Sequence, residues 1–140
     1  MTSQELIAYQ CRDIGRQIEK ATEGLDDSGW EYSSGTARSP RQTLAHLCEC
    51  YHALKVVAGG DEYEWGTLSY EDLLLDEVKG KFAIMRSEAV SIATQASDDA
   101  MLEKASSFIV AHDAYHLGQL CRTRMEFDPN WNPYSIYEEG

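Results

Sequence analysis

The stretch that decides the fold is residues 105–125, which read ASSFIVAHDAYHLGQLCRTRM. Residues on one side recur at the 3.6-residue period of an α-helix, and we expect this stripe to face a core: Ile109, His112, His116, Leu120 and Thr123. Because His112 and His116 are four residues apart, their imidazoles lie one turn apart on the same face. The stretch therefore predicts a long helix that carries two histidines toward the interior.

Two imidazoles in a protein interior need partners, because a buried polar group without a hydrogen bond costs free energy. One possibility is that a metal ion binds both, since a histidine pair spaced four residues apart on a helix is a common metal-binding arrangement. The other is that both are ordinary core residues, hydrogen-bonded to each other or to the backbone. A third ligand elsewhere in the chain would favour the metal site.

A second helix is predicted over residues 40–58. Ser39 is a good N-cap, the proline after it suits the first helical position, and glycines at positions 59 and 60 end the pattern. The inner face of this helix is mainly apolar and carries one histidine: Thr43, His46, Leu47, Cys50, Leu54 and Val57. His46 is therefore the candidate third metal ligand.

Two other residues of this helix are expected to have different roles. His52 follows His46 by six residues, which is about 240° around the helix, so we expect it at the surface. Cys50 lies one turn after His46 and is expected near the site as a core thiol rather than as a ligand. None of the four cysteines forms a CxxC pair, and all are expected to be reduced, mostly buried thiols: Cys11, Cys48, Cys50 and Cys121.

The rest of the chain before residue 97 predicts two more amphipathic helices. Thr2 or Ser3 can cap a first helix that continues to Leu25, and Ser69 is a possible cap for a third that continues to about Ile92. Glu71 and Asp72 would open the third helix, whose inner stripe includes Leu74 and Val78. The polar segments between the helices, residues 26–38 and 59–70, are expected to be loops.

The last segment opens with Ser97-Asp98-Asp99 and is either one helix to Phe127 or a short turn followed by the long helix. Asp128-Pro129 ends it, and the aromatic tail that follows is expected to pack back on the helices. Four long amphipathic helices without strand alternation predict an all-α bundle that forms a single domain over residues 1–140. The long second connection, between the second and third helices, could cross this bundle.

Composition restricts the classes of partner. The chain has 140 residues with 12 basic and 24 acidic side chains, a net charge of −12, which argues against binding to a nucleic-acid backbone. No run is long and apolar enough to span a membrane, and the N-terminus does not have the pattern of a signal peptide. We therefore expect a cytoplasmic protein.

Three segments carry a resemblance to a known family. They are SPRQTLAHL at residues 39–47, HDAYHLGQL at residues 112–120 and DPNWNPYSIY at residues 128–137. This pattern resembles the DinB-like (YfiT-like) superfamily of metalloenzymes. The resemblance implies a four-helix bundle with a long crossover, often a homodimer, and a divalent ion (zinc, nickel, iron or manganese) held by His46, His112 and His116.

The resemblance also implies a reaction. Characterised members are mostly S-transferases, which use the metal to activate a low-molecular-weight thiol such as bacillithiol, mycothiol or glutathione. Three neutral imidazoles leave at least one coordination position open, as in catalytic metal sites. Glu49 and Gln119 are the candidate acceptors that orient the ligands, whereas Asp113 points off the stripe and is expected to be solvated.

Other functions stay open. Metal-assisted hydrolysis of a small-molecule substrate, or a non-catalytic metal-binding role in a stress response, would use the same three histidines. The sequence offers no obvious protein nucleophile or acid. Only Arg41, Arg122 and Arg124 are candidates to hold an acidic thiol.

Overall fold

The computed structural model describes residues 1–96 and 98–139, and every regular element in these residues is helical. The prediction of an all-α chain is therefore confirmed. The long elements are α1 (Ser3–Thr22), α3 (Pro40–Ala58), α4 (Leu75–Thr94), and a run made of α5 (Asp99–Ala105), the π-helical turn η1 (Ser106–Ala111) and α6 (His112–Phe127). The short ones are α2 (Asp27–Glu31) and the 3₁₀ helix η2 (Pro133–Tyr137).

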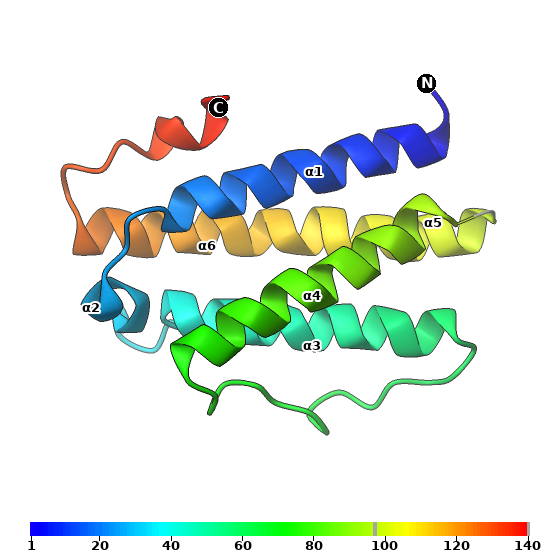
Figure 1. Ribbon diagram of the computed structural model, residues 1–140, viewed down its shortest axis with the longest axis horizontal. Helices are drawn as coiled ribbons and strands as arrows, with labels where there is room; N and C mark the ends of the chain where they lie inside the picture. The colour runs from blue at the N-terminus through cyan, green and yellow to red at the C-terminus, as the bar shows by residue number, and fades with distance from the viewer. Residues whose placement is uncertain (97, 140) are drawn as a thin grey trace.

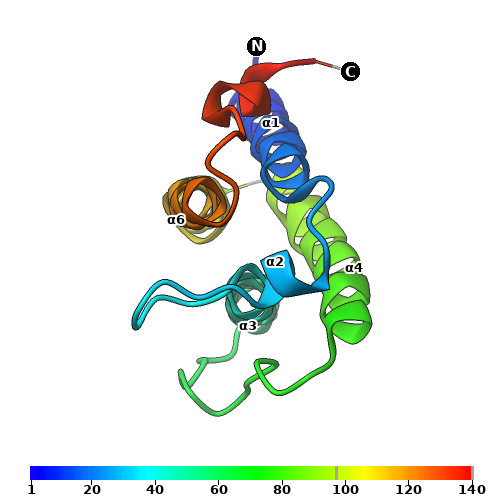
Figure 2. The same cartoon turned by 90° about the vertical axis from the view of Figure 1, so that its left-hand side faces the viewer.

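Figure 1 shows how the long helices lie side by side. The connection after α3 runs back along that helix, so α4 starts at the same end of the molecule as α3 and runs in the same general direction. α1 and α6 run the opposite way, and α1 contacts both α6 and α4. Viewed from the end in Figure 2, α3 and α4 lie together below α6 and α1.

Capping side chains set where α1 and α3 begin. The Thr2 hydroxyl accepts a hydrogen bond from the backbone of Glu5, whose side chain in turn accepts one from the backbone of Thr2. Ser39 and Gln42 form the same reciprocal pair at the start of α3. Each pair satisfies backbone N–H groups that have no partner within the helix. The predicted cap of α1 and both predicted ends of α3 are confirmed.

The prediction that residues 26–38 form only a loop was wrong. Asp26 accepts a hydrogen bond from the backbone N–H of Gly29 and caps the short helix α2. Trp30 in this helix is buried against the core. A helix as short as α2 does not give a periodic pattern in the sequence. The capping residue Asp26 is the one sequence signal that could have predicted it.

The third helix also starts later than predicted. The Ser69 hydroxyl accepts a hydrogen bond from the backbone N–H of Glu71, which closes a local turn instead of capping a helix. α4 begins only at Leu75, and Leu74, expected on its inner face, is 73% exposed. Val78 on the same predicted stripe is fully buried.

Of the two alternatives that the sequence left open for the last segment, the structure has the single helical run to Phe127. α5, η1 and α6 follow one another without a break, with a π-helical turn in the middle. Asp98 caps α5 by accepting a hydrogen bond from the backbone of Met101, whereas Ser97 lies outside the described residues. The tail packs back as predicted: Ile136 is buried and its carbonyl accepts a hydrogen bond from Arg16.

Two further features agree with the sequence analysis. All four cysteines are buried free thiols. Among the described residues, no helix has both the length and the apolar character that crossing a membrane requires.

Candidate metal centre

Helices α3 and α6 bring three histidines together. His46 comes from α3, and His112 and His116 come from the first two turns of α6. One ring nitrogen from each lies within 4.8 Å of the others. The Nε2 atoms of His112 and His116 are 3.2 Å apart. His116 is buried and the other two are half-buried, so the cluster lies at the edge of the core.

The spacing of these nitrogens suits one metal ion. A zinc–nitrogen bond is about 2.0–2.1 Å long, so two nitrogens on a tetrahedral ion are about 3.3 Å apart. The separation of 3.2 Å between the α6 histidines is close to this value. It is also a hydrogen-bond distance, so this contact alone fits the core-histidine alternative as well.

The hydrogen bonds of the cluster are incomplete. Nδ1 of His116 lies 2.7 Å from Oε1 of Gln119, as the sequence analysis predicted for an orienting acceptor. If Nδ1 donates this bond, the lone pair of Nε2 points toward the other two rings. Nδ1 of His112 is buried and has no hydrogen-bond partner within the described chain. The His112 nitrogen that faces His116 is Nε2, so Nδ1 lacks a partner among the described residues whether or not an ion binds Nε2.

All three imidazoles are neutral at physiological pH. Burial lowers the pKa of His46 and His112 and lowers the pKa of His116 to about 4. The positive charge of Arg38 lowers all three further. A neutral imidazole has a free lone pair, which is the form that binds a metal ion.

Glu49 does not orient a histidine, so that prediction was wrong. Its carboxylate accepts hydrogen bonds from the Tyr63 hydroxyl at 2.6 Å and from the backbone N–H of Gly66 at 3.1 Å. Glu49 therefore anchors the long connection to α3. Sequence spacing put it one turn from His46 but did not show that the returning loop would supply its partners.

Asp113 is not solvated, which corrects a second prediction. Its side chain is fully buried and accepts hydrogen bonds from the Tyr51 hydroxyl at 2.8 Å and from Arg86 at 3.2 Å. Arg86 also donates to the carbonyl of Cys11. Burial raises the pKa of Asp113 to about 6, although the charge of Arg86 lowers it. This buried network joins α1, α3 and α4 to α6 directly beside His112.

Cys50 lies against the cluster, as predicted. Its sulfur is 3.9 Å from Nε2 of His46 and from Nε2 of His112. Burial raises the pKa of this thiol to about 12, so it carries its proton at neutral pH. The group of side chains that can share one ion contains only the three histidines within the described residues.

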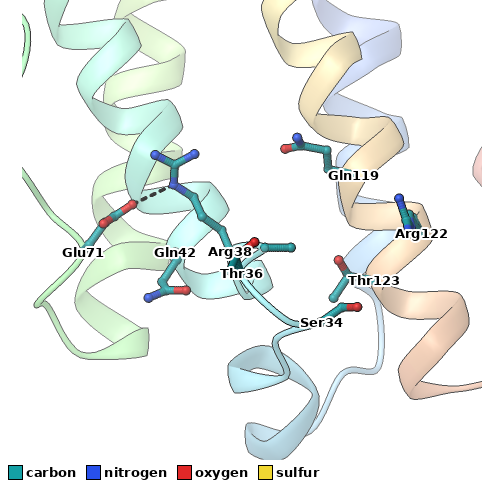
Figure 3. Close-up of a pocket in the computed structure, with 9 residues that line it drawn as sticks. Ser34, Thr36, Arg38, Gln42, Glu71, Gln119, Arg122 and Thr123 are labelled. Atoms are coloured by element: carbon teal, nitrogen blue, oxygen red, sulfur yellow. Dashed lines mark hydrogen bonds and ion pairs between the residues drawn. The ribbon is translucent and has the colours of Figure 1, made fainter.

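Two cavities lie beside the cluster. A cavity of about 170 Å³ is lined by His46, Glu49 and Tyr70, with Arg38 and Glu71 at its side. Arg38 and Glu71 also line a cavity of about 740 Å³, shown in Figure 3, whose other wall belongs to α6. The α6 wall consists of Gln119, Arg122 and Thr123.

The basic residues near this opening differ from those expected. Arg41 donates to Glu31 and to the carbonyls of residues 71 and 73, and Arg124 is buried and donates to carbonyls of residues 21 and 23. Neither is free to hold a ligand. Arg122 does line the large cavity, and Arg38, which the sequence analysis missed because it lies in a loop, stands opposite.

His52 lies outside the cluster, as predicted. Its ring packs edge-on against Tyr63, with centroids 5.8 Å apart. It is therefore a natural control for experiments on the other three histidines.

Comparison with known proteins gave no relative from which a function can be transferred. No family model matches the chain, and neither the curated proteins nor the solved structures contain a match.

Proposed function

We propose that this chain is a divalent-metal-binding protein of the DinB-like type, in which His46, His112 and His116 hold the ion. In this proposal α1, α3, α4 and the run ending in α6 form a four-helix bundle with a crossover between α3 and α4. The observation that carries the proposal is the convergence of three neutral imidazoles from two helices, with their nitrogens within 4.8 Å.

The reaction that this site fits best is activation of a low-molecular-weight thiol for S-transfer. A bound ion would supply Lewis acidity, because it lowers the pKa of a thiol or water at its open position. The protein's own groups do the rest. Gln119 orients His116, the low pKa values keep the imidazoles unprotonated, and the cavity lined by His46 lets a small molecule approach.

Metal-assisted hydrolysis is the second candidate, because the same open position also suits water. Substrate profiling with and without an added thiol separates the two: S-transfer requires the thiol and hydrolysis does not. A non-catalytic metal-binding role would show neither activity. We also expect a homodimer, which analytical ultracentrifugation of the untagged protein would test.

Elemental analysis of protein purified without a His-tag tests the metal site directly. About one ion per chain is expected, and chelation should lower the melting temperature, because a ligand that binds only the folded state stabilises it. His46→Ala, His112→Ala and His116→Ala should each abolish tight binding, whereas His52→Ala should not. Stoichiometric metal in the first three variants would contradict the assignment. Which of zinc, nickel, iron or manganese is found depends on availability as well as on ligands.

A further inference from the structure

The large cavity beside the histidines has a composition unlike the rest of the chain. The protein carries a net charge of −12, yet this cavity is lined by two arginines, Arg38 and Arg122, and by one acid, Glu71. Its other lining residues are mostly hydroxyl and amide side chains: Ser34, Thr36, Gln42, Gln119 and Thr123. Each arginine has an acidic partner, Glu71 for Arg38 and Glu126 for Arg122 at 3.7 Å. In an acidic protein, a cavity whose lining is rich in hydrogen-bond donors nevertheless favours an anionic ligand.

Arg38 stands between this cavity and the histidines. It lines both cavities, and its charge lowers the pKa of His46, His112 and His116 alike. Its Nε donates to the Glu71 carboxylate at 2.8 Å. Both side chains of this ion pair are more than a third exposed, so the pair contributes little to stability. Another carboxylate can therefore replace Glu71 at low cost.

Gln119 faces the same opening from α6. Its carbonyl oxygen is bonded to His116, and its amide nitrogen has no hydrogen-bond partner among the described residues. Figure 3 shows its side chain directed across the opening toward the side that carries Arg38. One residue thus contacts a candidate metal ligand through its oxygen and offers two N–H donors to the cavity through its nitrogen.

We propose that the large cavity binds a carboxylate group of the substrate, which takes the place of Glu71 on Arg38 and accepts a hydrogen bond from the Gln119 amide. Arginine forms two parallel hydrogen bonds to a planar carboxylate, which makes such a pair strong and specific. Glu71 remains nearby and repels a dianion more strongly than a monoanion, so a carboxylate is favoured over phosphate. The substrate class is then a small thiol or other nucleophile that bears a carboxylate.

This inference rests on the proposed function for the reaction, but binding of the carboxylate does not require the ion. It is therefore tested on metal-free protein. The probe is N-acetylcysteine, which carries one carboxylate and one thiol, and its neutral amide is the matched comparison. Binding is followed by NMR, through the side-chain amide signals of Gln119 in ¹⁵N-labelled protein.

N-acetylcysteine should shift these signals saturably, and the amide should not. Arg38→Gln should weaken binding at least about tenfold, since a charge-assisted pair is lost. Glu71→Gln should strengthen binding, because Arg38 loses its competing partner. Arg12→Gln, an exposed change of the same charge on α1, should leave binding unchanged.

Three outcomes would overturn the proposal: equal binding of the acid and the amide, unchanged binding in Arg38→Gln, or binding of inorganic phosphate at Gln119 as tight as that of N-acetylcysteine. The two substitutions at the ion pair act in opposite directions, so a general loss of folding cannot imitate the expected result. Failure here would leave the metal site untouched, because elemental analysis tests that site independently.

Discussion

Replacing His116 by glutamine should change how the stability of the metal-free protein depends on pH. Burial lowers the pKa of His116 from 6.5 to about 4, although its hydrogen bond to Gln119 opposes this. As the pH falls, the unfolded chain therefore binds the proton first. The contribution of neutral His116 to the free energy of unfolding is complete above pH 6.5 and is lost as the pH falls to about 4.

The size of this loss follows from the two pKa values. The difference between 6.5 and about 4 corresponds to about 3 kcal/mol, at about 1.36 kcal/mol per pKa unit. Screening by water does not reduce it much, because His116 is only 3% exposed. A change of about 3 kcal/mol is a large part of the about 5–15 kcal/mol by which a domain of this size is stable.

The assay is urea unfolding in the presence of a chelator, at about pH 7, 6, 5 and 4, for wild type and His116→Gln. The difference in the free energy of unfolding between wild type and His116→Gln should change by about 3 kcal/mol across this pH range. The wild type should lose more stability as the pH falls. The difference isolates His116, because the other titrating groups are common to both proteins. Parallel curves for wild type and His116→Gln would refute the assignment of a buried neutral imidazole.

Four other substitutions test the surroundings of the site. Asp113→Asn should have the opposite effect on the pH dependence of stability, because burial raises the pKa of Asp113 from 3.8 to about 6. The free energy of unfolding of the wild type should therefore rise by about 3 kcal/mol as the pH falls through this range, and urea unfolding of the variant should not show this rise. Tyr51→Phe should lower the free energy of unfolding by about 1–2 kcal/mol and weaken metal binding about tenfold in a chelator competition, because it removes a bond to the residue beside His112. Cys50→Ser should leave metal stoichiometry unchanged, since among the described residues only the three histidines place their ligand atoms close enough together to share one ion; loss of the ion would make Cys50 the fourth ligand. Ser39→Ala should cost about 1 kcal/mol in thermal unfolding by removing the cap of α3, and an unchanged melting temperature would contradict that role.

Local patterns were sufficient to predict most of the helices and the three histidines. A spacing of four residues is enough to place His112 and His116 on one face, and the apolar stripe of α3 is enough to predict that His46 points inward. Both inferences depend only on helix geometry within one element. The predicted starts of α1 and α3 were correct for the same reason.

What could not be predicted depends on contacts between elements. Glu49 is one turn from His46 in the sequence, but a loop that returns along α3 supplies its partners, Tyr63 and Gly66. Arg38 lies in a loop without periodicity, and only the fold places it beside the histidines. The start of α4 depends on a local turn at Ser69 that competes with the helix. In each case the deciding partner is distant in sequence or is a backbone group.

The misjudged Asp113 shows how the site is held in place. His112 and Asp113 are adjacent, so their side chains point about 100° apart on α6, and both directions are packed. A buried carboxylate is costly, and this one is tolerated because Arg86 from α4 and Tyr51 from α3 hydrogen-bond to it. Since α3 also carries His46, the Tyr51 bond fixes the two histidine-bearing helices relative to each other one residue away from His112. The separation of the three histidines is therefore set in part by the buried network behind them, and an ion bound there would meet a site whose helices are already positioned.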